Sequence, residues 1–361
     1  MAYVRVHTDR LRRGMVIKND IYARTGAVLI PADTTVTKEV VTLLTKHFIE
    51  YVMVEYQAAA SIPADIPSPE SVPQIKQQQI EEFKESFQVA ETVLSDTLKD
   101  VAVKDKDVDI DILLDMLNSI VDKSQNEVNL CNMLFAMKNN AEGLYVHSIN
   151  VALWGQMLAK WMGFKEEDVE LVGVAGLLHD IGLLKLTDSG ALPKGFTFHE
   201  ELNSRKYSKH TVLGYNILKD KNININVKQA VLTHHECKDG SGFPLKIALK
   251  NINPISRVIS IADTYDTMTM KEDGIKPKSS FWLLKRLEDT GYQKYDPNML
   301  MTFIARVANN FIRNSVRLSN GLVGQIVLIN EFNLTRPLIQ TGNSFIDLSV
   351  RKNLSIVEIL D

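Results

Sequence analysis

The sequence predicts a multidomain protein that is mainly an all-α helical bundle, with a small N-terminal β-rich (α+β) domain and a short C-terminal β tail. Short β-prone runs occupy the first 57 residues. From residue 80, apolar residues recur at the three-four spacing of amphipathic helices, and β-prone runs return after about residue 315. A length of 361 residues suits two or three domains.

Residues 1–57 are expected to form the small first domain. Its β-prone runs, which turn residues separate, are 4–6, 14–17, 27–30 and 51–54. Between the last two runs, residues 38–48 have the apolar spacing of a helix. Residues 58–75 carry four prolines among small residues, so we expect an extended linker there.

Residues 76–126 are expected to form two amphipathic helices that lead into the bundle. The apolar positions that share a face are Phe83, Phe87, Ala90, Leu94 and Val101 in the first helix and Ile110, Leu114, Leu117 and Val121 in the second. These faces could pack onto the following domain. The spacing also suits a coiled-coil seam, so a homodimer through residues 80–121 is the alternative.

Residues 127–312 form the expected main domain, which is rich in helical spacing. This segment holds six of the eight histidines of the chain. Residues 313–361 are expected to form the β tail, with β-prone runs at 321–328 and 345–348.

The charge balance limits the class of ligand. Lys and Arg number 41 and Asp and Glu number 44, which gives a net charge of −3. We therefore expect neither a nucleic-acid polymer nor a membrane as partner, and an anionic ligand would need local charge, such as a metal ion. Cys131 and Cys237 cannot form a disulfide framework, and neither a signal sequence nor a membrane-spanning run is evident. A cytoplasmic protein is the expectation.

The most informative segment is an apolar run, residues 171–178, that ends in adjacent polar residues, His179 and Asp180. So complete an apolar run predicts a buried helix. Burying both polar side chains without partners would cost several kcal/mol. They therefore need hydrogen bonds or a cation.

Other side chains of the metal-ligand type are also predicted to point inward. They are His147, His210, His234, His235 and Asp263. His147, for example, shares a helix face with Val151 and Leu158, and Asp263 ends an apolar run that begins at residue 255. Five histidines and two aspartates exceed the needs of a core, so we expect a metal centre.

The number of candidate ligands suits two metal ions, because a structural zinc site needs only four. Imidazole and carboxylate ligands suit iron, manganese or zinc. Asp180 is the best bridging candidate, since each carboxylate oxygen can serve a different ion. A bridged pair roughly 3.5–4 Å apart generates hydroxide at neutral pH and neutralises a phosphoryl transition state.

The motif His147…His179-Asp180…Asp263 resembles the HD phosphohydrolase superfamily. The further segments His210, His234-His235-Glu236, 239–244 and 262–266 are similar to its HD-GYP branch. The resemblance covers about residues 140–312. The segment 11–15 resembles the small domain often fused ahead of HD-GYP domains, and the segment from 318 onward resembles the tail that often follows them.

The resemblance implies a helical HD-type bundle that hydrolyses cyclic di-GMP to linear pGpG, in some members on to GMP, in bacterial second-messenger signalling. It implies two divalent ions, with iron or manganese favoured, zinc, nickel or cobalt as alternatives, and a third ion left open. The implied ligands are His147, His179, Asp180, His210, His234, His235 and Asp263. The implied substrate contacts are Gly242, Phe243 and Pro244, where the Phe243 ring either stacks on a guanine or only packs within the protein. Lys276 is the expected phosphate contact in place of the family's arginine.

Several positions depart from the pattern of the family that this chain resembles, among them Gly143-Leu144 ahead of the first histidine. Three of them bear on catalysis and substrate binding. Leu183 stands where that family has a lysine, and the nearest lysine, Lys185, would have to reach in from another face. The leaving oxygen would then be stabilised by metal, or protonated by solvent or by Lys185 as a catalytic group. Phe243 replaces the tyrosine of the GYP triplet. Glu272 stands near the expected place of a phosphate-contacting arginine, where its charge would repel phosphate.

Two rival functions stay open at this point. The first is a catalytically weak sensor of the cyclic dinucleotide, or a protein-interaction scaffold, which Leu183 and Glu272 favour. The intact set of candidate ligands speaks against it. The second is a hydrolase of another nucleotide, such as a cyclic GMP-AMP dinucleotide.

Overall fold

The computed structural model describes residues 2–8, 11, 15–22, 28–46, 49, 51–56, 77–137, 143–188, 207–269, 279–330 and 333–360. The chain divides into two compact units, Met1–Pro73 and Gln74–Asp361. The expected proline-rich linker at 58–75 lies outside the described residues.

The first unit contains a small antiparallel sheet and one helix. Its elements are β1 (Ala2–His7), β2 (Val16–Ile17), β3 (Ile21–Tyr22), β4 (Val28–Ile30), β5 (Thr34–Thr35), α1 (Lys38–Lys46) and β6 (Tyr51–Tyr56). Strands β1, β6, β2 and β5 lie in that order, and β3 pairs with β4. Ile17, Leu44 and Val54 are buried in its core. An α+β unit is therefore present where β-prone runs and one helix were predicted.

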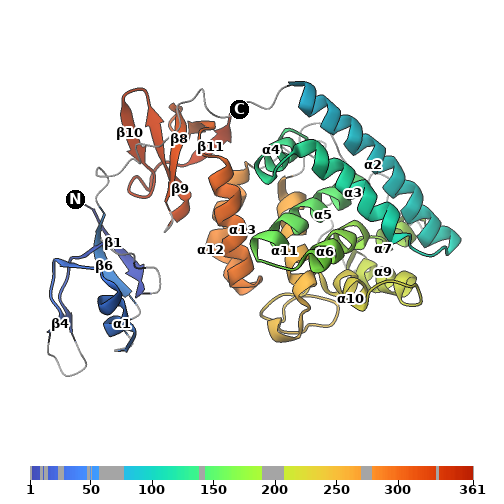
Figure 1. The fold of residues 1–361 in the computed structure, drawn as a ribbon, viewed down its shortest axis with the longest axis horizontal. Coiled ribbons are helices and arrows are strands. Elements are labelled where there is room, and N and C mark those ends of the chain that lie inside the picture. The colour runs from blue at the N-terminus through green and yellow to red at the C-terminus, as the bar shows by residue number, and fades with distance from the viewer. Residues whose placement is uncertain are drawn as a thin grey trace. The chain divides into compact units, whose positions relative to one another are not determined.

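The second unit is mainly helical (Figure 1). In chain order, its helices are α2 (Gln77–Lys104), α3 (Ile110–Ser124), α4 (Glu127–Met137), α5 (Leu144–Trp161), α6 (Glu166–Leu178), α7 (Gly182–Asp188), η3 (Tyr207–Lys209), α9 (His210–Leu218), α10 (Ile225–Thr233), η4 (Leu249–Asn251), α11 (Pro254–Thr269), α12 (Ser280–Thr290), η5 (Gly291–Gln293) and α13 (Pro297–Asn310). Across the described residues, none of the helices is both long enough and apolar enough to cross a membrane.

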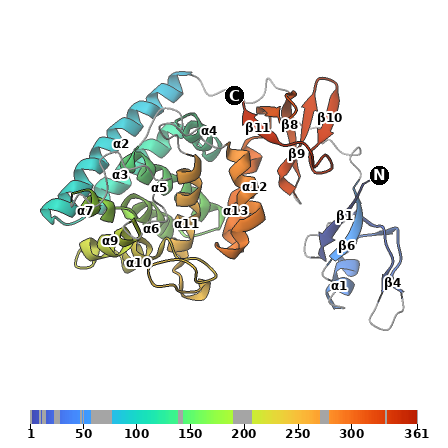
Figure 2. The same ribbon diagram turned by 180° about the vertical axis from the view of Figure 1, so that it is seen from behind.

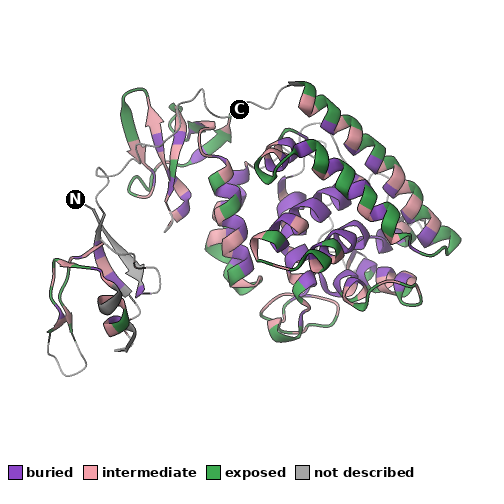
Figure 3. Ribbon diagram, in the orientation of Figure 1, coloured by how far each residue is buried: buried purple, intermediate pink, exposed green. Residues whose placement is uncertain are grey.

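The centre of this unit is α5, which packs against α6 and α11. Nearly every described position of α5 and α6 in Figure 3 is buried except at their ends. The two helices approach closely at Gly176, where an added Cβ would lie only 2.5 Å from Ala152 Cα. A larger side chain would push α6 away from α5, so glycine is needed at this crossing.

The amphipathic helices α2 and α3 lie side by side and cover the bundle (Figure 2). Phe83, Phe87 and Leu94 of α2 are at most 1% exposed, and Leu117 of α3 is fully buried. Because these faces are already covered within one chain, they are not available as a dimer seam. The expected homodimer through residues 80–121 thus loses its basis, and packing onto the following domain is the outcome.

The second unit ends in a five-stranded antiparallel sheet. Its strands are β7 (Ser315–Leu318), β8 (Val323–Asn330), β9 (Asn333–Thr341), β10 (Ser344–Asp347) and β11 (Ile356–Ile359), in the spatial order β10-β9-β8-β7-β11. Glu288 of α12 joins the helices to this sheet, because its carboxylate accepts hydrogen bonds from the Leu334 amide and the Thr335 hydroxyl. The predicted β tail is therefore a sheet that packs on the bundle.

Candidate metal centre

The apolar helix α6 delivers His179 and Asp180 to the interior. Both residues follow Leu178, the last residue of the helix, and they are 0% and 1% exposed. His179 Nδ1 lies 2.7 Å from the Gly176 carbonyl oxygen and must donate to it, since a carbonyl only accepts. The local turn therefore uses one ring nitrogen and leaves Nε2 directed inward.

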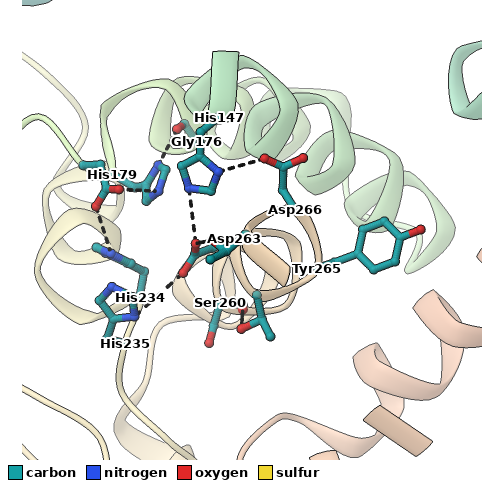
Figure 4. A network of polar contacts seen from close by, with 12 residues as sticks. His147, Gly176, His179, His234, His235, Ser260, Asp263, Tyr265 and Asp266 are labelled. Atoms are coloured by element: carbon teal, nitrogen blue, oxygen red, sulfur yellow. Dashed lines mark hydrogen bonds and ion pairs between the residues drawn. The ribbon is translucent and has the colours of Figure 1, made fainter. Parts of the chain in front are cut away.

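Four other elements bring the remaining candidate side chains to the same place. His147 lies in the first turn of α5, His210 is the first residue of α9, and Asp263 lies in α11. His234 and His235 directly follow α10. Residues more than 100 positions apart in the sequence thus meet in one buried cluster (Figure 4).

The seven side chains form two adjoining groups. Asp180, His210, His234 and His235 make up one group, and His147, His179 and Asp263 the other. Within each group, one ligand atom per residue lies within 4.8 Å of the others. Asp180 faces both groups, because its Oδ1 lies 3.1 Å from His210 Nε2 and its Oδ2 lies 3.4 Å from His179 Nε2.

The buried polar atoms of this cluster fit metal ions. His179 Nε2 and both carboxylate oxygens of Asp180 are buried without a hydrogen-bond partner. Leaving such atoms unsatisfied costs about 1–3 kcal/mol each, and more for a charged group. Cations would remove this cost, and imidazole nitrogens with carboxylate oxygens are donors that suit first-row transition metals.

Burial and charge set the protonation of the histidines. Burial lowers the pKa of His234 to about 3, and the neighbouring imidazole rings of the cluster add to the effect. His147 behaves differently: burial opposes its charge, but hydrogen bonds to Asp263 and Asp266 outweigh burial and raise its pKa to about 10. Without a cation, the proton on His147 therefore offsets the charge of one carboxylate and leaves the other unbalanced.

The two aspartates of the cluster stay ionised. Burial alone would raise the pKa of Asp180, but its electrostatic interactions with the surrounding imidazoles outweigh burial and lower the pKa. The pKa of Asp263 is also lowered, since the hydrogen bond from His147 outweighs burial. Ionised carboxylates are the form that binds metal ions.

The loop after His235 forms a lip beside the cluster. The Phe243 ring lies 4.7 Å from the His235 ring, with 31° between the planes. Gly242 packs on the backbone of the preceding turn, where an added Cβ would lie 2.4 Å from His235 O. Pro244 is half-buried beside Phe243. The lip is therefore held directly against one of the candidate ligands.

Of the two expected lysines, the structure describes Lys185 and not Lys276. Lys185 is exposed on α7, and the charge that it influences is that of Asp105, in the loop between α2 and α3. The expectation that it reaches in as a catalytic group gains no support from this placement, because the Lys185 side chain is exposed to solvent. Lys276 and Glu272 lie outside the described residues.

Two acidic residues near the cluster were quoted in the motifs without a role. Asp266 accepts a hydrogen bond from His147, and it lies three residues after Asp263, so helical spacing could have placed both on one face. Glu236 is 3% exposed and accepts backbone N–H groups from residues 245, 246 and 247. No sequence signal indicates that role, because it depends on how the lip folds back.

Comparisons with known proteins agree with this geometry. A sequence model of the HD domain matches residues 120–299, which include all seven clustered residues. A cyclic di-GMP phosphodiesterase of Pseudomonas aeruginosa is 26% identical over 227 residues, which cover 63% of this chain and 54% of that protein. A cyclic di-GMP phosphodiesterase of Borreliella burgdorferi is 29% identical over 195 residues, which cover 54% of this chain and 51% of that protein.

The chain thus spans about half the length of these curated relatives. The solved structure of an HDG"Y"P protein from Bdellovibrio bacteriovorus matches 84% of this chain and 98% of its own, with a TM-score of 0.51 and 13% identity. That likeness shows a shared fold. The HD-domain match, together with the His179-Asp180 pair at the centre of the cluster, identifies residues 120–299 as an HD domain.

Proposed function

We propose that this chain is a metal-dependent phosphodiesterase that hydrolyses a cyclic dinucleotide, namely cyclic di-GMP to linear pGpG, with or without further cleavage to GMP. The observation that carries the proposal is the convergence of seven buried imidazole and carboxylate side chains in two adjoining groups. The names of the similar proteins from Pseudomonas aeruginosa and Borreliella burgdorferi support the choice of substrate. Residues 127–312 are the catalytic domain in this proposal.

Each group of the cluster would hold one divalent transition-metal ion. Asp180 would bridge the two ions, because its two oxygens face different groups. Iron or manganese is favoured by the mixed nitrogen and oxygen donors, with zinc, nickel or cobalt as alternatives. The other ligands would be His210, His234 and His235 for one ion and His147, His179 and Asp263 for the other.

When bound, the ions would supply an activated water and positive charge beside the phosphodiester. The chain's own contribution is to hold five imidazoles and two carboxylates rigidly in a buried site. Two carboxylates offset only half the charge of two divalent ions, so the loaded centre would attract an anion. The protein thus needs no basic surface to bind a dinucleotide, which agrees with its net charge of −3.

The lip of Gly242, Phe243 and Pro244 is the proposed substrate contact. Phe243 is half-buried and packed on His235, so it lies where a base of the dinucleotide would enter beside the centre. Base–aromatic stacking contributes roughly 1–3 kcal/mol per base. Lys276 stays a proposed contact for phosphate.

One observation favours a catalytically weak sensor as the second candidate function. Leu183 is 2% exposed and packs in an apolar cluster with Leu186 and Tyr207. Position 183 therefore lacks the lysine ammonium group that the HD-GYP branch, which this chain resembles, carries there. A sensor would bind the cyclic dinucleotide through the same centre without cleaving it.

The test is a cleavage assay on chain purified without oxygen, with bound metals measured by elemental analysis. Cyclic di-GMP, cyclic di-AMP and 3′3′-cyclic GMP-AMP are incubated with the chain and added iron(II) or manganese(II), and the products are separated by chromatography. We expect close to two ions per chain and conversion of cyclic di-GMP to pGpG.

Asp180→Asn is the matched variant, because it keeps the size of the side chain and removes its charge. It should lose both the metal and turnover, whereas Asp220→Asn, at an exposed aspartate, should keep both. Tight binding of cyclic di-GMP without cleavage by metal-loaded wild type would favour the sensor. Full cleavage by a chain without transition metal would overturn the proposal.

A further inference from the structure

Each of the five clustered histidines has one ring nitrogen in contact with an oxygen outside the set of candidate ligands. His147, His179, His210 and His234 all use Nδ1 for this contact. The partners of these four nitrogens are Asp266 Oδ2 at 2.8 Å, Gly176 O at 2.7 Å, Tyr207 O at 2.5 Å and Val231 O at 3.0 Å. Metal-binding histidines need such a contact, because it fixes which nitrogen carries the proton and which faces the metal.

His235 is held the other way round. Its Nε2 lies 3.4 Å from the Tyr207 hydroxyl, and its Nδ1 faces Asp263, 3.8 Å from Oδ2. If Nε2 carries the proton, Nδ1 presents its lone pair to the Asp263 side of the cluster. If Nδ1 carries the proton, the ring offers an N–H where a ligand is needed.

Tyr207 is built into the centre from two directions. Its carbonyl accepts from His210, and its ring packs on the rings of His210 and His235, with centroids 4.4 and 5.7 Å apart. The side chain is 1% exposed and is supported by Leu183 and Leu186. A lysine at position 183 would place a charge against this buried ring, so Leu183 and Tyr207 are mutually compatible.

We propose that Tyr207 is a positioning residue of the metal centre, which accepts a hydrogen bond from His235 Nε2–H on its hydroxyl and so directs His235 Nδ1 to the cation. This inference rests on the proposed function only in assuming that the cluster binds metal. One residue thereby orients two ligands of the Asp180 group, His210 through its carbonyl and His235 through its hydroxyl.

The first test measures the proton on His235 directly. Long-range nitrogen–hydrogen NMR spectra of the full chain, labelled on histidine and stripped of metal, report which ring nitrogen is protonated, and His235→Gln identifies the signal. We expect the Nε2–H form in wild type and a mixture of both forms in Tyr207→Phe. An Nδ1–H ring in wild type would overturn the inference, whether or not the chain cleaves cyclic di-GMP.

The second test measures manganese binding. Tyr207→Phe removes only the hydroxyl and should weaken binding of one of the two ions roughly 10–100-fold. Tyr265→Phe is the control, since Tyr265 is also fully buried but its hydroxyl points away from the cluster (Figure 4). Thermal unfolding of both variants checks folding. If Tyr207→Phe binds both ions as tightly as Tyr265→Phe does, the inference is wrong.

Discussion

The carboxylate of Asp266 lies 2.8 Å from His147 Nδ1, and both side chains are 0% exposed. This contact holds the imidazole so that its other nitrogen, Nε2, lies 3.3 Å from Asp263 Oδ1. Because Asp263 and Asp266 are one helical turn apart on α11, a single helix both fills and orients this part of the cluster.

Asp266→Asn should weaken metal binding at this part of the cluster. The amide keeps the size of the carboxylate but accepts the His147 hydrogen bond without a negative charge, so the imidazole becomes a poorer ligand. We expect roughly 10–100-fold weaker binding of one ion, measured by manganese titration. Asp220→Asn is the control, and equal affinities in the two variants would show that Asp266 does not orient His147.

Glu236→Gln should loosen the lip. The carboxylate oxygens of Glu236 lie 2.5, 3.0 and 3.0 Å from the amide nitrogens of Leu245, Lys246 and Ile247. A glutamine offers one acceptor oxygen and an NH2 group that cannot accept. We expect a loss of about 1–3 kcal/mol in the free energy of unfolding in urea.

The same variant should raise KM for the dinucleotide more than it lowers kcat, because Glu236 acts on the lip and not on the metal. Asp239→Asn is the control in the same loop, because the exposed Asp239 carboxylate accepts a hydrogen bond from the backbone N–H of Ser241. If Glu236→Gln loses stability but its KM is unchanged, the lip does not contribute to substrate binding.

Leu94→Ala should destabilise the chain, because Leu94 is fully buried on the inner face of α2. Truncating a buried leucine leaves a cavity and costs about 2–5 kcal/mol, measured by urea unfolding. Val89→Ala, on the exposed side of the same helix at 64% exposure, should change the free energy by less than about 0.5 kcal/mol. A large effect of Val89→Ala and a small one of Leu94→Ala would contradict the burial of the Leu94 face against the bundle.

Removing the metal should lower the thermal stability. The buried carboxylates and imidazoles would then lack their cations, and a ligand at about 100 times its Kd stabilises the folded state by about 2.7 kcal/mol. We expect a chelator to lower Tm and excess manganese to restore it. Asp180→Asn should show no such metal-dependent shift in Tm. If a chelator leaves the Tm of the wild type unchanged, this would contradict metal binding at the cluster.

Much of the second unit could be predicted from local spacing. The apolar stripe of Phe83, Phe87 and Leu94 predicted a helix, and α2 is that helix with the stripe buried. The apolar run before His179 predicted a buried helix that ends in polar side chains, as α6 does. Both predictions depend on neighbours within a few turns, which the periodicity of the chain reports directly.

Two features depended on contacts between residues far apart in the sequence. They are the element that covers an apolar helix face and the direction of a side chain that follows a turn. The sequence could not choose between a dimer seam and the bundle for α2, nor show that α7 turns Lys185 to solvent. The same holds for the role of Tyr207, whose hydroxyl meets His235 only after α9 and α10 pack together. Residue type and helical period determine which side chains can bind a cation, whereas the packing of distant helices decides which of their atoms meet.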